Sequence, residues 1–346
     1  MTSNTIRWGI IGCGDVCEVK SGPGFQKAAN SALVAVMRRD GGKAADYAKR
    51  HGVPRWYDDA EALIGDPEVD AVYVATPPGS HLEYALRVAA AGKPCYVEKP
   101  MARTHAECRR MIGAFAASQQ PLFVAYYRRA LPRFVKVKEL IDSGRLGRVT
   151  GCQYRMLRPY RPNPDPAWRL DAGESGGGLF LDIGSHMLDL LDHLLGPFAE
   201  FGGCAATSGA TQVEDAVTLH FRTERDIVGA ATWNFAASHS QELLEIDGTE
   251  AMLSMQVLGH TPITLARNGE TIESFNIPDP PHVHQPLIQT AVDQLRGGGG
   301  GGGGRCPSTG ETAGRTSAVM DAVLSSFYNG RDEAFWDRPA TWRPRS

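Results

Sequence analysis

The sequence lacks the features that mark several specialised classes of protein. Its 346 residues carry 36 basic and 39 acidic side chains, a net charge of −3, so the basic excess of a general nucleic-acid-binding protein is missing. No apolar run approaches the roughly 18 residues that a membrane-spanning helix needs. The N-terminus lacks the basic start and apolar middle of a secretion signal, so we expect a cytoplasmic protein without nucleic-acid or membrane partners.

Cysteine is sparse and irregularly spaced. The seven cysteines are an odd number and include no CxxC pair. This pattern argues against a disulfide framework or a structural zinc site, and it is typical of small buried apolar residues in a reducing compartment. The length allows two domains, because one hydrophobic core rarely grows beyond about 250–300 residues.

Short β-rich runs alternate with helical stretches in the first part of the chain. The runs cover residues 6–12, 33–39, 69–76, 94–100 and 121–127. Strands that alternate with helices of about 10–15 residues predict a parallel sheet with helices on both faces. We therefore expect a Rossmann-type, doubly wound α/β domain over residues 1–127.

The pattern changes after residue 127. A helical stretch over 132–143 precedes a series of strands without intervening helices, and two of these strands have hairpin spacing. Residues 128–346 are therefore expected to form an α+β domain with a large open, mostly antiparallel sheet. Eight consecutive glycines at 297–304 predict a flexible link, and a last helix is expected from about residue 311 to 327.

A glycine-rich turn follows the first β-rich run. Gly12, Gly14 and Cys17 match the spacing of the G-x-G-x-x-G/A dinucleotide motif, with a small residue in the third position. Gly12 permits the tight turn, and Gly14 allows the backbone to approach a pyrophosphate at the following helix N-terminus. We expect Asp15 and Val16 to belong to the same cofactor-binding turn.

The end of the second run bears on the choice of dinucleotide. NAD sites carry an acidic residue about 20 positions after the glycine motif, whereas this chain has Arg38 there, with Arg39 and Lys43 close by. A guanidinium can bind a 2′-phosphate that a carboxylate would repel. These residues favour NADP over NAD. The alternative is that the arginines are solvated and that Asp40 serves the ribose.

Residues 176–196, GGGLFLDIGSHMLDLLDHLLG, combine core-forming leucines with polar side chains. Asp182, His186, Asp189 and His193 are spaced four, three and four residues apart, which on a helix places them on one face. We expect the apolar side of this helix to pack in the core and the polar side to line a cleft between the domains. A zinc site from the four residues is an alternative, but it would leave the glycine motif unexplained, and no metal is expected.

Three motifs together resemble the glucose–fructose oxidoreductase, inositol dehydrogenase and rhizopine catabolism (Gfo/Idh/MocA) family. They are the early glycine turn, EKP at 98–100 and GGGLFLDIGSH at 176–186, and the resemblance runs from about residue 6 to about residue 277. The resemblance implies a Rossmann domain joined to an open-sheet domain, and oxidation or reduction of sugars, inositols and related compounds with NAD or NADP. It also implies a homodimer or homotetramer, because the open sheet would otherwise expose a large apolar patch.

The resemblance also implies roles for individual residues. Lys99 corresponds to the catalytic lysine of the family, and Asp182 and His186 correspond to its D-x-G-x-H segment. The loop that contains Thr76, Pro77 and His81 is expected along the cofactor, as is Glu98. Alcohol oxidation needs a base and a group that stabilises the developing alkoxide. An imidazole with its ordinary pKa of about 6.5 suits the base, so His186 takes that role, Lys99 donates to the same oxygen and Asp182 orients the substrate or the imidazole.

The substrate is expected to be a sugar, a polyol or a related alcohol or carbonyl compound. Tyr127, Arg128, Trp168 and Arg169 are the candidate contacts, because aromatic faces suit sugar C–H surfaces and arginines suit hydroxyl or carboxylate oxygens. Two alternatives stay open: a non-catalytic NADP-binding sensor or regulator of the same fold, and a glycoside hydrolase that uses bound NAD. The presence of both Lys99 and His186 argues against the sensor.

Overall fold

The computed structural model describes residues 5–160, 167–297 and 305–343, which form two compact units. The first unit contains the chain up to Ala102 together with residues 107–131 and 280–314, and the second contains residues 103–106, 132–279 and the chain from Arg315 onward. The expected domain boundary between residues 127 and 128 stays a prediction. Of the expected glycine link, Gly298 to Gly304 lie outside the described residues.

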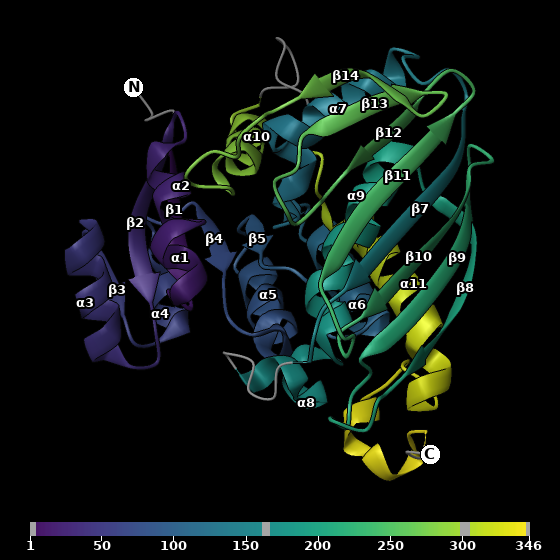
Figure 1. Ribbon diagram of the computed structural model, residues 1–346. Coiled ribbons are helices and arrows are strands. Elements are labelled where there is room, and N and C mark those ends of the chain that lie inside the picture. The colour runs from purple at the N-terminus through teal and green to yellow at the C-terminus, as the bar shows by residue number, and fades with distance from the viewer. Residues whose placement is uncertain (1–4, 161–166, 298–304, 344–346) are drawn as a thin grey trace. The chain divides into compact units, whose positions relative to one another are not determined.

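The first unit is built on a six-stranded parallel sheet (Figure 1). The spatial order is β3-β2-β1-β4-β5-β6, which is that of a Rossmann domain, so the doubly wound fold is confirmed. The strands are β1 (Ile6–Ile11), β2 (Ser31–Met37), β3 (Arg55–Tyr57), β4 (Ala71–Val74), β5 (Cys95–Val97) and β6 (Leu122–Val124).

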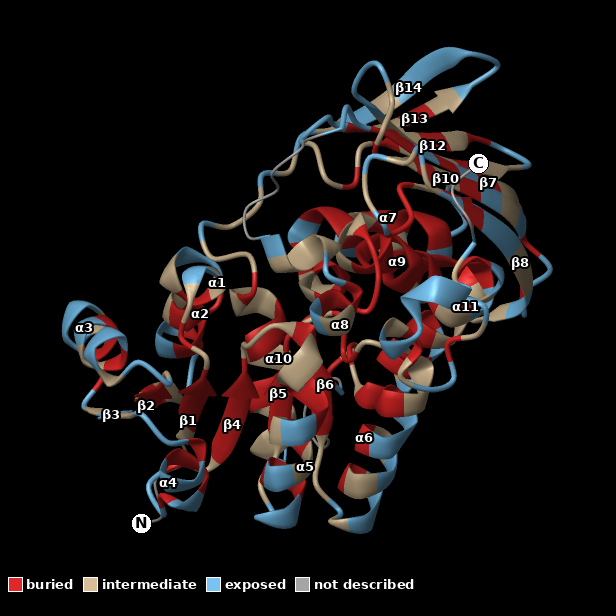
Figure 2. Ribbon diagram, turned by 90° about the horizontal axis from the view of Figure 1, so that it is seen from below, coloured by how far each residue is buried: buried red, intermediate tan, exposed pale blue. Residues whose placement is uncertain are grey.

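Helices cover this sheet, and its central strands are buried on both faces (Figure 2). In β4, Val72 and Val74 belong to one hydrophobic cluster while Tyr73 belongs to another, as the two-residue period of a strand requires. The helices of this unit are α1 (Asp15–Val19), α2 (Gly22–Lys27), α3 (Gly41–His51), α4 (Ala60–Gly65), α5 (His81–Ala90), α6 (His105–Ala117) and α10 (Gln285–Leu295).

Helix α10 joins the first unit although it lies far along the chain. Its residues Leu287, Ile288, Ala291 and Val292 are fully buried in the same cluster as Trp8. A Cβ atom on Gly24 of α2 would come within 2.9 Å of the Ile288 side chain, so glycine at that position allows the two helices to approach closely. The sequence pattern alone did not predict this packing.

The second unit contains an eight-stranded sheet in the order β14-β13-β12-β11-β7-β10-β9-β8. All neighbours in it are antiparallel except β7 and β10, which confirms the expected large, mostly antiparallel sheet. The strands are β7 (Val149–Leu157), β8 (Phe198–Ala206), β9 (Ala216–Thr223), β10 (Val228–Asn234), β11 (Gln241–Gly248), β12 (Met252–Met255), β13 (Ile263–Arg267) and β14 (Glu270–Phe275).

One face of this second sheet is buried and the other is more open. Along β9, buried Val217, Leu219 and Phe221 alternate with the more exposed Thr218 and His220. The helices of the unit are α7 (Pro132–Asp142), the short α8 (Ala172–Ser175), α9 (Ser185–Leu195) and most of α11 (Gly310–Tyr328), and α9 is buried along nearly its whole length. Within the described ranges, no helix is long and apolar enough to cross a membrane.

Candidate active site

The glycine turn at the end of β1 has a backbone shape that only glycine suits. Gly12 has φ +87°, and a Cβ atom there would lie 2.7 Å from the Thr76 side chain. Gly14, in contrast, is open, because a Cβ atom on it would find only the Gly12 carbonyl oxygen, at 3.9 Å. The turn is therefore tight against Thr76, and its backbone at Gly14 is accessible to a bound group.

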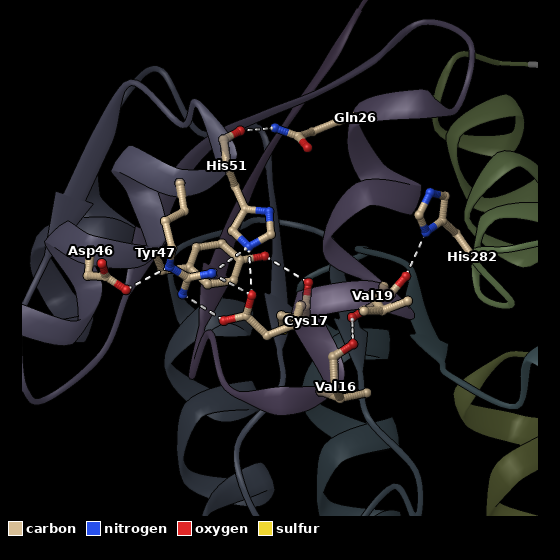
Figure 3. A network of polar contacts seen from close by, with 11 residues as sticks. Val16, Cys17, Val19, Gln26, Asp46, Tyr47, His51 and His282 are labelled. Atoms are coloured by element: carbon tan, nitrogen blue, oxygen red, sulfur yellow. Dashed lines mark hydrogen bonds and ion pairs between the residues drawn. The ribbon is translucent and has the colours of Figure 1, made fainter.

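Figure 3 shows the polar network that fixes α1 to α3 beside this turn. Glu18 of α1 accepts hydrogen bonds from Arg50 of α3 at 2.7 and 2.8 Å, and its Oε2 lies 2.8 Å from the His51 ring nitrogen. The Arg50 guanidinium is the main reason that the pKa of Glu18 is lowered to about 2. Tyr47 of α3 also donates to the Cys17 carbonyl oxygen, so the short helix after the glycine turn has several contacts that hold it.

Asp40 and Arg38, the two candidates for the ribose site, follow β2 and have different contacts. The Asp40 carboxylate accepts a hydrogen bond from the Lys43 backbone N–H, an N-cap contact that lowers the pKa of Asp40. Burial raises the pKa of the Cys13 thiol, within the glycine turn, to about 11, and the charge of Arg38 opposes this rise. Arg38 therefore lies close to the turn. Asp40 thus caps α3, whereas the Arg38 charge lies near the turn.

The loop after β4 is joined to the loop after β5 by His81. The His81 ring is fully buried, with Nε2 2.7 Å from the Thr76 carbonyl oxygen and Nδ1 3.0 Å from that of Pro100. Burial lowers the pKa of His81, so the ring is neutral at physiological pH and one ring nitrogen donates. The Lys99–Pro100 peptide is cis. His81 thereby connects the residues that flank Thr76 and Lys99.

Glu98 is buried directly before Lys99, at the end of β5. Its Oε1 accepts a hydrogen bond from the Tyr73 hydroxyl at 2.5 Å, and its Oε2 accepts one from the Lys99 backbone N–H at 3.1 Å. Burial raises the pKa of Glu98, and the charges of Lys99 and Lys20 oppose that rise. The contacts of Glu98 fix the backbone from which the Lys99 side chain extends.

His284 adds a residue that the sequence motifs did not assign to the site. Its Nδ1 lies 3.7 Å from Glu98 Oε1, and its ring stacks on that of Tyr127 with centroids 4.4 Å apart. Burial, together with the charges of Lys20, Lys99 and Arg128, lowers the pKa of His284 to about 3. The structure therefore brings the predicted Lys99, Glu98, Tyr127 and Arg128 into one cluster, with Lys20, Tyr73 and His284 as additions.

In the second unit, the segment before α9 is not the regular helix that the spacing predicted. Gly176 has φ +84°, and residues Phe180–Gly184 form a π-helical turn before α9 begins at Ser185. A Cβ atom on Gly176 would lie 2.5 Å from the Arg103 carbonyl oxygen, so close backbone packing bends the chain here. Asp182 lies on the π turn and His186 on α9, so the expected α-helical alignment of the four polar residues is wrong at its first step.

The side chains of this segment have different surroundings. Asp182 accepts a hydrogen bond from Arg169 Nε at 2.8 Å, and that guanidinium lies 5.3 Å from the centre of the Trp168 ring. His186 and Asp189 are buried. The structure thus brings together Asp182 with two predicted substrate contacts. Over the described ranges, no group of three or more histidine, cysteine or acidic residues could hold a metal ion.

A buried glutamate also holds this segment in place. Both Glu214 carboxyl oxygens lie 2.9–3.0 Å from the Gly178 backbone nitrogen, which donates to them, and the Tyr328 hydroxyl donates to Oε2. Burial raises the pKa of Glu214. Arg331 donates to the Gly176 carbonyl oxygen at 2.6 Å, so the backbone before the π turn is bound from both sides. No short motif in the sequence signalled these partners.

Two family models match the chain. Residues 6–126 match the model of an oxidoreductase family with an NAD-binding Rossmann fold, and residues 134–254 match the GFO/IDH/MocA C-terminal domain. Together the two matches cover the first sheet and the greater part of the second. Both lie where the structure places the corresponding sheets.

Individual proteins show the same relationship. Oxidoreductase P35 from Formosa agariphila is 39% identical over 327 residues, which are 93% of this chain and 99% of that protein. The 1,5-anhydro-D-fructose reductase of Ensifer adhaerens is 28% identical over 84% of this chain and 88% of its own length. A solved levoglucosan dehydrogenase in complex with NADH has the same fold, with a TM-score of 0.81 at 22% identity over 93% of this chain and 96% of that one. The chain therefore belongs to the GFO/IDH/MocA family and is an oxidoreductase with an NAD-binding Rossmann fold.

Proposed function

We propose that the chain transfers a hydride between NADP and a hydroxyl or carbonyl carbon of a sugar or polyol, with Lys99 and His186 as catalytic residues. One observation carries the proposal. Gly12, Thr76 and Lys99 follow β1, β4 and β5, which are adjacent parallel strands, so all three lie at the same edge of the sheet. In open α/β sheets the ligand binds at this edge, where the strand order reverses, and here the reversal falls between β1 and β4.

The cofactor-binding residues are proposed from the same edge. Gly12, Gly14, Asp15 and Val16 provide the turn for the pyrophosphate, and Thr76 and Pro77 flank it. The close approach of Gly12 to Thr76 and the open backbone at Gly14 fit a bound dinucleotide. His81 and Glu98 contribute by fixing the two loops.

NADP is proposed over NAD because the acidic residue nearest the ribose position already caps a helix. The Asp40 carboxylate accepts from the Lys43 backbone, whereas Arg38 offers a guanidinium beside the turn, with Arg39 and Lys43 nearby. Arg38→Ala should weaken NADPH binding by about 10- to 100-fold and leave NADH binding nearly unchanged, because a charge-assisted contact to the 2′-phosphate is lost. Equal affinity of the wild type for both cofactors in fluorescence titration would contradict this choice.

The proposed chemistry divides the work between two side chains. When bound, the cofactor supplies the nicotinamide carbon that accepts or gives the hydride. The Lys99 ammonium donates a hydrogen bond to the reacting oxygen and stabilises its negative charge during alcohol oxidation. A ring nitrogen of His186 takes the hydroxyl proton and returns it in the reducing direction. Asp182, through its ion pair with Arg169, helps to orient the substrate contacts of the second unit.

A sugar or polyol substrate is supported by the relatives. The 1,5-anhydro-D-fructose reductase and a levoglucosan dehydrogenase from Pseudarthrobacter phenanthrenivorans, which is 29% identical over 61% of this chain, are named for sugar derivatives. A panel of polyols, aldoses and sugar acids with NADP⁺, followed by the absorbance of reduced nicotinamide, tests the proposal. Stoichiometric reduction by at least one compound is expected. Failure of all compounds would favour the sensor, and cofactor that copurifies and never dissociates would favour the glycoside hydrolase.

A homodimer or homotetramer in the cytoplasm is part of the proposal. Val228 of β10 and Ile272 of β14 expose 55% and 45% of their surface, as expected for a sheet face that a second copy covers. Six of the seven cysteines are buried and all seven are free, which fits a reducing compartment. Light scattering tests the first part: a particle of about 75 kDa or 150 kDa is expected from a chain of 37.4 kDa.

A further inference from the structure

Arg128 has hydrogen-bonding capacity that the described part of the protein does not use. The residue exposes 9% of its surface, and among the described residues its Nε and Nη1 atoms are buried without a hydrogen-bond partner. A guanidinium is always charged and its nitrogen atoms only donate. Burying such donors unpaired costs free energy, so a native arginine in this state points to a partner that binds from outside the chain.

The described side chains around Arg128 do not supply that partner. Its guanidinium lies 5.0 Å from the centre of the Tyr127 ring, a cation–π contact that offers no oxygen or nitrogen acceptor. His284 stacks on the same tyrosine and is neutral at physiological pH. The carboxyl group of this cluster, Glu98, is bound by Tyr73 and by the Lys99 backbone.

The local charge is also positive. Lys20, Lys99 and Arg128 all lie close enough to His284 to lower its pKa. The acidic group of this cluster, Glu98, already accepts hydrogen bonds from Tyr73 and from the Lys99 backbone. A ligand that entered here would meet three cations and one carboxyl group that is already bound. Such a field favours an anion over a neutral molecule.

We propose that Arg128 binds a carboxylate of the substrate, which makes the substrate a sugar acid of the aldonate type rather than a neutral polyol. The inference rests on the proposed function, because it assigns a substrate class to the same site. A neutral hydroxyl can accept one of the open N–H groups but leaves the buried charge uncompensated. A carboxylate accepts several charge-assisted hydrogen bonds and neutralises the guanidinium.

The test compares acids with neutral molecules of the same carbon skeleton. D-gluconate is paired with D-glucitol, and D-galactonate with galactitol, so that each pair differs by a carboxylate in place of a hydroxymethyl group. Binding to the full-length protein is measured by titration calorimetry with NADPH present. None of the four probes contains a carbonyl carbon that the reduced cofactor can readily reduce, so the experiment measures binding without turnover.

The expected result is a preference that depends on Arg128. At least one acid should bind about 10- to 100-fold more tightly than its neutral partner, and Arg128→Gln should remove most of that preference. Arg128→Lys should keep part of it, because the charge remains while the planar fork is lost. Arg110→Gln removes an exposed arginine of α6 in the same unit, and it should leave the preference unchanged.

Three results would overturn the proposal. The first is that no acid binds more tightly than its neutral partner. The second is that the preference for the acid survives in Arg128→Gln. The third is that this variant loses NADPH affinity while the acid preference stays intact, which would assign Arg128 to the cofactor. If Arg128→Gln fails to fold, Arg128→Lys provides the comparison. Failure of the proposed function appears separately, as lack of hydride transfer in the substrate panel, and does not alter a binding preference measured here.

Discussion

Two buried glutamates, one in each unit, hold the segments that carry the candidate catalytic residues. Glu98 accepts hydrogen bonds from the Tyr73 hydroxyl and from the backbone of Lys99. Glu214 accepts them from the Tyr328 hydroxyl and from the backbone of Gly178, four residues before Asp182. Burial raises the pKa of both carboxyl groups.

The two glutamates differ in where their partners come from. Glu98 is adjacent to Lys99 in the sequence, and its surroundings include Lys20 and His284. Both oxygens of Glu214 face one backbone nitrogen that lies 36 residues away in the chain. Glu98 therefore binds the backbone of the residue next to it, whereas Glu214 binds a backbone segment far away in the sequence. We therefore expect the segment that carries His186 to be more sensitive to changes in its support than the segment that carries Lys99.

The largest effect in this comparison is expected from Glu214→Gln. A glutamine amide group would place a donor against the Gly178 N–H or the Tyr328 hydroxyl, so the free energy of unfolding should fall by about 1–3 kcal/mol. Because the π turn is displaced, the hydride-transfer rate of the folded protein should also fall by roughly 10-fold. Urea unfolding and steady-state kinetics measure the two quantities, and NADPH affinity should stay unchanged.

The matched control for this variant is Glu242→Gln. Glu242 also binds a tyrosine hydroxyl, that of Tyr154, and the backbone nitrogens of Val257 and Leu258, in the same unit. It should lose comparable stability without a change in the rate per folded molecule. If both variants lose activity equally, Glu214 contributes to general stability and has no positioning role.

His284, in the first unit, predicts a pH dependence of the unfolding free energy. Its pKa is about 3 in the folded protein and 6.5 ordinarily, so the unfolded chain binds a proton that the folded chain excludes. Stability from this group is complete above about pH 6.5 and is lost as the pH falls, by about 2 kcal/mol at about pH 5. His284→Phe should remove this part of the slope in urea unfolding at several pH values. An unchanged slope would show that His284 titrates normally in the folded protein.

The two tyrosine hydroxyls provide a smaller and more direct comparison. Tyr73→Phe and Tyr328→Phe each remove one hydrogen bond to a buried glutamate, and each should cost about 1 kcal/mol of unfolding free energy. Tyr328→Phe should also reduce activity slightly, because Glu214 keeps its contact with Gly178 but loses its second anchor. A larger activity loss in Tyr73→Phe than in Tyr328→Phe would reverse the comparison between the units.

The smallest effect is expected from Glu18→Gln, in the network of Figure 3. The Glu18 side chain is 35% exposed, so its pairs with Arg50 and His51 are screened by water. The unfolding free energy should fall by about 1 kcal/mol or less, and the pH-dependent slope that we expect from His284 should stay unchanged. A loss of unfolding free energy as large as that of Glu214→Gln would show that solvent exposure does not decide how much each glutamate contributes to stability.

The sequence predicted the features that depend on local patterns. The alternation of β-rich and helical stretches predicted the first sheet, and the run of strands without intervening helices predicted the second. The glycine turn and the EKP motif placed Gly12 and Lys99 directly after β-rich runs, which the structure has as β1 and β5. The family was also identified from these motifs and is confirmed. Each β-rich run, turn and motif lies within a few consecutive residues, and for that reason it can be recognised without knowledge of the fold.

The remaining features depend on contacts between distant residues. His284 lies beside Glu98 because α10 packs into the first unit, and nothing near either residue indicates this. The π turn before α9 comes directly after two tertiary contacts, the close packing of Gly176 against Arg103 and the contact of Gly178 with Glu214. The four-residue spacing of Asp182 and His186 predicted a regular helix because these tertiary contacts do not appear in the spacing.

The central claim is that Lys99 stabilises the charge that forms on the reacting oxygen, and hydride transfer by Lys99→Met tests it most directly. The substitution keeps an unbranched side chain of nearly the same length and removes the ammonium group, and Lys49→Met, on α3, serves as the control. With saturating NADP⁺ and the best substrate of the panel, we expect a rate lower by roughly 100- to 1,000-fold, with cofactor affinity unchanged. A Lys99→Met rate close to that of the wild type would contradict it.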